Sequence, residues 1–451
     1  MNQEITALEE QLNHFDPSAR AQALDALLAL VADGTLTLPP ADEVANMHCH
    51  TFFSFNGYGY SPTGLAWLAK RRGYKLMGIV DFDILDAVDE WLRVADMLAL
   101  RASTGMETRA YLPEFAAREI NSPGEPGITY HMGIGFASSQ VPEGEAMAQR
   151  IIDTMRRRAV DRNLDLIARV NSFLDPVAVD YERDVLPLTP AGNPTERHIC
   201  LAYVTVAAAT VHDPVHFWAA KLDVPEAKVA AVIDHGPAIQ NLVRSKLMKR
   251  GGVGYVQPGP DTFPPIDEVN KMIAACGALP TITWLDGTSE GEQAAEELFD
   301  LMIDKGAVAL NIVPDRNWNI ADRQAKGVKL QNLYDVVALA ESLALPINVG
   351  TEMNAYGTPL IDNFDAPEMA PVRRIFLDGA YFVYAHTTLH RAVGLGYQSA
   401  WAVGHFPDRR ERNAFYTQVG RALPPGTATL TRLRDLGTGP DPDDVLRVGQ
   451  S

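Results

Sequence analysis

The chain has 451 residues, of which 47% are hydrophobic and 21% charged, as in an ordinary globular protein. Its net charge of -18 excludes a nucleic-acid surface spread over the whole molecule, although a local basic patch around an anionic substrate is compatible with it. Three scattered cysteines argue against a disulfide framework, and no apolar run is long enough to span a bilayer. We therefore expect free thiols, a cytoplasmic location and no membrane partner.

The predicted elements begin with two short helices over residues 2–33. Their break at Asp16-Pro17-Ser18 offers Asp16 or Ser18 as a cap for the second helix. From residue 44 onwards strands and helices alternate, which is typical of an α/β fold. Helical patterns crowd between Glu143 and Ala274 with few strand signals, which predicts a helical insertion. The predicted strands are residues 44–48, 75–83, 103–111, 129–136, 279–285, 307–313 and 346–354.

The length allows one large α/β domain with additions, or two domains. About seven strands favour an incomplete parallel barrel over an open doubly wound sheet, that is, a distorted (β/α)7 barrel with a helical insertion. The expected organisation is a helical N-terminal extension (1–43), the first part of the barrel (44–139), the helical insertion (140–275), the second part of the barrel (276–362) and a C-terminal extension that packs on the barrel (363–451).

The stretch from Asn46 to Pro62, NMHCHTFFSFNGYGYSP, places two histidines near the end of the first barrel strand. Because side chains alternate along a strand, His48 and His50 share one face while Cys49 points to the other. Barrels of this class carry their chemistry at the carboxyl ends of the strands. The pair suits two metal ligands, and it equally suits two polar side chains satisfied by backbone groups.

Polar residues also lie at the ends of other predicted strands. In a parallel barrel these ends converge on one rim. Imidazole and carboxylate groups gathered on one rim suit Zn, Mn or Fe. The residues concerned are His48, His50, Asp81, Asp83, Glu107, His131, Glu352 and Asn354.

Four of these segments resemble, in order, the motifs of the polymerase and histidinol phosphatase (PHP) superfamily of metal-dependent phosphoesterases. HCHTFFSFNGYGYSP resembles the opening His-X-His motif, GIVDFD the second motif, GMET the third, and YHMGIGF the histidine strand that follows. RHICLAYV and LMKRGGVGYVQP resemble elements of one PHP branch, which acts on nucleotides and short oligonucleotides and carries a helical insertion. The resemblance covers roughly residues 44–360 and implies a PHP-type barrel.

The sequence also departs from the PHP pattern. Phe82, Trp284 and Asn354 stand where the family has histidines, and Glu352 stands where it has an aspartate. The resemblance therefore implies an altered site that holds one or two divalent ions rather than three. The ligands that it implies are His48, His50, Asp81, Glu107, His131, His198 and Glu352.

The resemblance implies hydrolysis of a small phosphorylated substrate by a metal-activated water. Asp81, Glu107 and His198 are the expected catalytic groups, and Asp83 is expected behind them. Arginines suit phosphate oxygens, although salt bridges on the rim explain them equally well. The expected substrate contacts are Arg109, Arg197, Trp284 and Asn354.

A second function remains open on the same residues. The chain could be a catalytically inactive PHP-like barrel that binds a small molecule or a protein. Phe82 and Trp284 would make the rim drier and narrower, which suits ligand stacking as well as catalysis.

Overall fold

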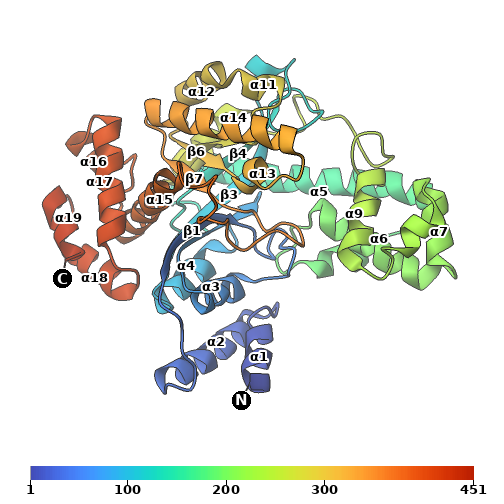
Figure 1. Cartoon of the computed structure of the whole chain (residues 1–451), viewed down its shortest axis with the longest axis horizontal. Helices are drawn as coiled ribbons and strands as arrows, with labels where there is room; N and C mark the ends of the chain where they lie inside the picture. The colour runs from blue at the N-terminus through green and yellow to red at the C-terminus, as the bar shows by residue number, and fades with distance from the viewer. Residues whose placement is uncertain (1, 451) are drawn as a thin grey trace.

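Seven strands form one sheet in chain order in the computed structural model, which describes residues 2–450. The sheet curls until its two edges approach each other, and the exchange of two backbone hydrogen bonds joins them. His50 N–H donates to the Glu352 carbonyl and Glu352 N–H donates to the His48 carbonyl, both at 2.7 Å. The result is a nearly closed barrel (Figure 1). The strands are β1 (Asp42–Cys49), β2 (Tyr74–Phe82), β3 (Arg101–Tyr111), β4 (Ile128–Ile134), β5 (Leu279–Trp284), β6 (Ala309–Ile312) and β7 (Ile347–Val349).

The barrel departs from the expected parallel arrangement at one strand. β4 runs antiparallel to both β3 and β5, whereas the other neighbouring pairs are parallel. The connection from Leu112 to Gly127 contains a single helical turn (Pro113–Phe115) and folds straight back, with Leu112 N–H donating to the Gly127 carbonyl at 2.8 Å. Parallel neighbours are usually joined by a crossover helix. This connection has no such helix and returns at the same end of the barrel, so β4 runs antiparallel.

Helices cover the outside of the barrel on several sides. α3 (Pro62–Arg71) and α4 (Val88–Met97) contact β2 and β3, and α10 (Ile266–Ala275) contacts β5. α15 (Arg373–Val393) packs on β1, β2, β3 and β7. Gly379 allows this close approach, because a Cβ there would lie 1.8 Å from the Ile347 carbonyl oxygen. The other barrel helices are α11 (Glu290–Gln293), α12 (Ala295–Asp304), α13 (Asp315–Trp318) and α14 (Arg323–Ser342).

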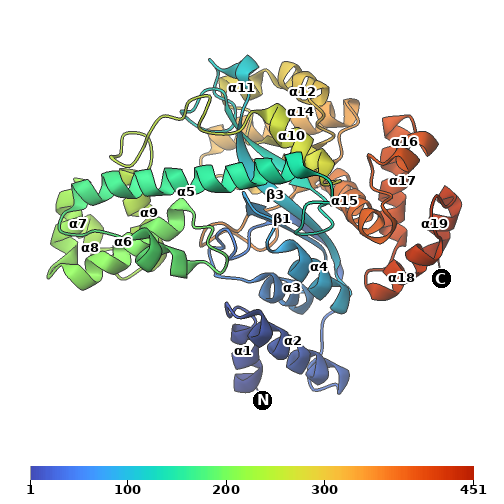
Figure 2. The same ribbon diagram turned by 180° about the vertical axis from the view of Figure 1, so that it is seen from behind.

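A helical lobe, residues 146–247, projects from one side of the barrel (Figure 2). α5 (Ala146–Leu174) is the long helix that runs from the barrel into it. The lobe has its own hydrophobic core, with Tyr203 and Trp218 fully buried, separate from the core around the barrel. α10 packs with the barrel core and against the first part of α5. The lobe's other helices are α6 (Glu196–Thr210), α7 (Pro214–Leu222), α8 (Glu226–Ala230) and α9 (Gly236–Leu247), with short helical turns at Tyr181–Val185 and Leu186–Leu188.

Helices occupy the first and the last part of the described residues. α1 (Asn2–Gln11) and α2 (Pro17–Ala32) are separated where the sequence predicts, and the Asp16 side chain accepts from Ser18 N–H as the cap of α2. The three cysteines are free and buried. Within residues 2–450 no helix is long and apolar enough to cross a bilayer. The chain ends with α16 (Ala400–His405), α17 (Arg409–Ala422), α18 (Thr427–Asp435) and α19 (Pro442–Val448).

A buried ion pair fastens the N-terminal helices to the barrel. The Arg20 guanidinium in α2 makes two hydrogen bonds with the Glu90 carboxylate in α4, and it also donates to the carbonyls of His14 and Phe15. The Arg20 side chain is only 3% exposed. Removing one partner of a buried pair leaves the other charge uncompensated, which is more costly than losing an exposed pair.

We expect Arg20→Ala to lower the free energy of unfolding by about 3 kcal/mol, because the buried guanidinium is lost and the partly buried Glu90 carboxylate loses its charged partner. Urea denaturation followed by circular dichroism measures this change. Arg93→Ala, on the exposed side of the same helix α4, is the matched control and should change stability by less than about 0.5 kcal/mol. Equal stability of the two variants would show that the Arg20 pair does not fasten the helices.

Candidate functional site

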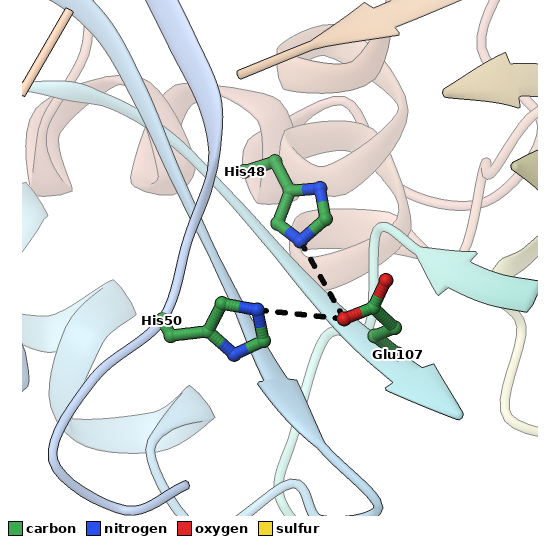
Figure 3. Close-up of side chains that lie close together, drawn as sticks. All are labelled: His48, His50 and Glu107. Carbon is green, nitrogen blue, oxygen red and sulfur yellow. Dashed lines mark ion pairs between the residues drawn. The ribbon is translucent and has the colours of Figure 1, made fainter. Parts of the chain in front are cut away.

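The two histidines at the end of β1 face one carboxylate of β3 (Figure 3). His50 Nε2 lies 3.4 Å from Glu107 Oε2, and His48 Nε2 lies 4.0 Å from the same oxygen. Candidate ligand atoms of the three side chains all lie within 4.8 Å of one another, and all three residues are buried. Across residues 2–450, no other group of three or more His, Cys, Asp or Glu has this spacing. We call these residues the His-His-Glu group.

The imidazoles of this group have nitrogen atoms without hydrogen-bond partners. Both ring nitrogens of His48 and Nε2 of His50 are buried and make no hydrogen bond. Burial lowers the pKa of His48 to about 4, so its imidazole is neutral at physiological pH, the form that binds a metal. Burial also lowers the pKa of His50, but the Glu107 carboxylate outweighs this effect and the net shift is upward. Two imidazoles and a carboxylate are a donor set that suits Zn and related divalent ions, so the residues fit a metal.

The other ring nitrogen of His50 is held by a short chain of hydrogen bonds. The Ser54 hydroxyl donates to Asp81 Oδ1 at 2.6 Å and lies 3.1 Å from His50 Nδ1. Since the single hydroxyl proton of Ser54 points to Asp81, His50 must donate its Nδ1 proton to Ser54. In the neutral imidazole the proton then lies on Nδ1, and Nε2, which faces Glu107, is the nitrogen available to a metal. Metal-binding histidines are commonly oriented in this way by a hydrogen bond to the second nitrogen.

Asp81 lies behind His50 rather than beside the His-His-Glu group. Its two oxygens accept from Thr51 N–H, the Thr51 hydroxyl and the Ser54 hydroxyl, at 2.6 to 2.8 Å. These contacts tie the loop after β1 to the end of β2. In the structure Asp81 therefore helps to position His50 through Ser54. It does not lie where a metal ligand or a catalytic group was expected. Asp83 accepts from the Thr108 hydroxyl and lies 3.8 Å from Arg162 of α5.

His131 does not join the group, because the register of β4 places it on the other face of the sheet. In the β3–β4 register, Glu107 is opposite Met132 and His131 is opposite Thr108. Directly opposed residues share a face of the sheet, so His131 lies on the face away from Glu107. There its Nε2 is 2.6 Å from Asn270 Oδ1 of α10, outside the barrel. The expectation that His131 is a ligand therefore does not fit the structure.

Glu352 reaches the site but is held by other side chains. Its Oε2 is 2.6 Å from Arg316 Nη2 and accepts from the Asn354 amide at 2.7 Å. The expected metal-ligand role of Glu352 is thus replaced by an ion pair, and Asn354 supports that pair. Arg316 is four residues past β6, so the rule that polar residues just after strands form the rim would have found it.

The two aromatic replacements lie on opposite faces of the sheet. Phe82 is opposite Glu107 in the register, and its ring is 6.3 Å from that of Tyr130, so it lines the interior. Thr281 is opposite Met132 and shares that interior face, and Trp284 is three residues further along the same strand. Trp284 therefore points outward and is buried in the hydrophobic core. The expected substrate contact of Trp284 does not fit this position.

The helical lobe reaches the rim near the loops after β1 and β2. The His198 ring packs edge-on against Phe55 at 5.0 Å, and Arg197 lies over the same ring at 5.6 Å. His198 Nδ1 accepts from Thr195 N–H at 3.0 Å and closes a capping box at the start of α6. Burial lowers the pKa of His198 to about 4. The structure thus uses its Nδ1 as a helix cap and does not bring His198 into the His-His-Glu group.

Arg109 lies on the interior face, as its spacing of two from Glu107 predicts. It is opposite Tyr130 in the register, and its Nη1 is 3.0 Å from Glu125 Oε2. Its guanidinium also stacks on Phe263 at 4.2 Å. Arg109 is therefore salt-bridged and lies on the interior face, and its contact with a substrate stays a prediction.

No protein-family model and no curated protein sequence matches the chain. An amidohydrolase from Chromobacterium violaceum, solved with bound sulfate and no metal, matches at 14% identity and a TM-score of 0.49, over 74% of this chain and 96% of its own. A candidate metal-dependent phosphoesterase from Bifidobacterium adolescentis matches at 17% identity and a TM-score of 0.45, over 75% of this chain and 96% of its own. What the site can do follows from its own side chains.

We expect Ser54→Ala to weaken Zn²⁺ binding by about 10- to 100-fold, because His50 loses the hydrogen bond that orients its ring. Calorimetric titration of the metal-free protein with Zn²⁺ measures this affinity. Ser245→Ala, at an exposed position of the helical lobe, is the matched control and should bind Zn²⁺ as the wild type does. Unchanged affinity in Ser54→Ala would remove the positioning role of this hydroxyl.

Stability should fall as the pH is lowered from about 6.5 toward 4. Burial lowers the pKa of His131 to about 4, whereas a histidine in an unfolded chain titrates near 6.5. In this range the unfolded state takes up a proton that the folded state does not, which costs up to about 1.4 kcal/mol per pH unit for each such histidine. Urea denaturation of the metal-free protein should show a shallower pH slope for His131→Gln than for the wild type. Identical slopes would contradict the prediction.

Proposed function

We propose that the chain is a metal-dependent hydrolase of phosphate esters, a PHP-type phosphoesterase whose metal site is reduced to the His-His-Glu group. The observation that carries the proposal is the convergence of His48, His50 and Glu107 in a buried position where three ring nitrogens have no hydrogen-bond partner. Buried polar atoms without partners are uncommon and costly, and a bound cation would satisfy them.

The donor set supports hydrolysis more than a structural metal site. Structural zinc sites are usually closed by four protein ligands, whereas catalytic sites keep three and leave a position open. Such an ion, when bound, supplies Lewis acidity and a nucleophilic water at neutral pH. His48, His50 and Glu107 would hold it, and Ser54 and Asp81 would keep the ring of His50 in place.

The charges around the group support an anionic substrate. Arg109 on β3, Arg316 after β6 and Arg197 at the start of α6 bring three guanidinium groups to this side of a chain whose net charge is -18. Guanidinium groups bind phosphate oxygens with paired hydrogen bonds and stay charged at any physiological pH. A small phosphorylated compound is the substrate class that we propose.

The alternative function, an inactive binding barrel, was based on Phe82 and Trp284 as aromatic residues at the rim, and only Phe82 has such a position. Trp284 lies outside the barrel, so it cannot narrow the rim. Phe82 and Tyr130 do form an aromatic wall beside Glu107, which suits either function. Metal retention separates the two, since a binding module has no need of the His-His-Glu group.

We expect the double variant His48→Ala, His50→Ala to lose metal retention and to hydrolyse phosphate esters at least about 100-fold more slowly, because even residues behind metal ligands commonly matter by 10- to 100-fold. Elemental analysis measures Zn, Mn and Fe per chain, and p-nitrophenyl phosphate and bis(p-nitrophenyl) phosphate report mono- and diesterase activity. His405→Ala, an exposed position on α16, is the control.

Circular dichroism should show that the double variant keeps its fold. If the folded double variant retained metal as the wild type does, the metal would bind at residues other than His48 and His50. A wild type that takes up neither Zn, Mn nor Fe would leave the binding-module alternative as the function.

A further inference from the structure

Arg316 brings a positive charge close to the His-His-Glu group, and it was not among the residues that we expected from the sequence. Its Nη2 is 2.6 Å from Glu352 Oε2, and this carboxylate is only 10% exposed. The charges of Glu352 and, less strongly, of Glu107 both raise the pKa of Arg316, and the Arg316 charge in turn lowers that of His48. The guanidinium is thus electrostatically part of the group.

The Arg316 side chain is well placed to contact a ligand as well. Its side chain is 44% exposed, and among residues 2–450 its only hydrogen-bond partner is Glu352. Three of the five N–H donors of a guanidinium, on Nε and Nη1, therefore have no partner in these residues. They face solvent beside a buried group that fits a cation.

We propose that Arg316 takes the place of a second metal ion. It neutralises Glu352, so that the His-His-Glu group holds a single ion, and it presents its remaining N–H donors to an oxyanion of the ligand, a phosphoryl group in particular. The inference rests on the proposed function for the identity of that oxyanion. The assignment of Arg316 and Glu352 to each other rests on their contact alone.

The physical logic is one of charge balance. Glu107 and Glu352 bring two negative charges near the two histidines, and a single divalent ion held by Glu107 leaves Glu352 to be neutralised. A fixed guanidinium neutralises Glu352 without a second ion. Unlike an exchangeable ion, it stays in place when the metal is removed. The site would therefore keep part of its affinity for an oxyanion in the metal-free protein.

The first test measures inorganic phosphate binding by calorimetry in the Zn-loaded and the metal-free protein. Arg316→Gln should weaken phosphate binding by about tenfold or more in both forms, since hydrogen bonds to a charged group are lost. Arg316→Lys should bind phosphate with an affinity between those of the wild type and of Arg316→Gln, because lysine keeps the charge but lacks the paired donors of the guanidinium. Arg323→Gln, an exposed position at the start of α14, is the matched control and should bind phosphate as the wild type does.

The second test counts metal ions and does not depend on turnover. The wild type should take up one equivalent of Zn²⁺, and Glu352→Gln should still take up one equivalent with similar affinity, because Glu352 is not a ligand. Two equivalents in the wild type, or loss of Zn²⁺ from Glu352→Gln, would overturn the inference, as would wild-type phosphate affinity in folded Arg316→Gln. Failure of the proposed function looks different: phosphate and Zn²⁺ would bind as described, but no phosphate ester would be hydrolysed.

Discussion

The pair of backbone hydrogen bonds between β1 and Glu352 closes the barrel and sets the site at the same time. These bonds flank Cys49, so the residues on either side, His48 and His50, are fixed in position by the closure itself. Glu352 and Met353 adopt the left-handed backbone conformation, with φ of 66° and 55°. Such a conformation is costly for residues other than glycine and persists where the surroundings determine it, often near functional sites. The same two backbone hydrogen bonds therefore close the barrel and fix the position of Glu352.

A second physical theme is the unusual polarity of the barrel interior. The Asn46 amide donates to the hydroxyl of Thr351, which follows β7. The Asn348 amide of β7 donates to Asn311 Oδ1 of β6. This pairing is incomplete, because Asn311 Nδ2 and Asn348 Oδ1 have no hydrogen-bond partner, and neither do the ring nitrogens of His48. Each buried polar group without a partner costs about 1–3 kcal/mol, so these groups lower the stability of the folded protein. A cation bound to the ring nitrogens would remove their part of this cost, and its binding would be stronger for that reason.

Much of the fold could be predicted from the sequence, and the exceptions have a physical reason. Local patterns gave the alternation of strands and helices, the shared face of His48 and His50, and the Asp16 cap. Neither the direction of β4 nor its register with β3 could be predicted from its own residues, and the face on which His131 lies depends on that register. The ion pair of Glu352 could not be foreseen from its motif, because Arg316 comes from a different loop.

The reversal of β4 also changes which positions can vary the chemistry of this barrel. In the parallel strands the residues at the carboxyl end reach the rim, whereas on β4 the rim lies at the amino end, near Tyr130. Tyr130 and Met132 face the interior, while Thr129 and His131 face the surrounding helices. In a library designed to alter the specificity of the site, Tyr130 is thus the informative position on this strand, and variation at His131 would test packing instead.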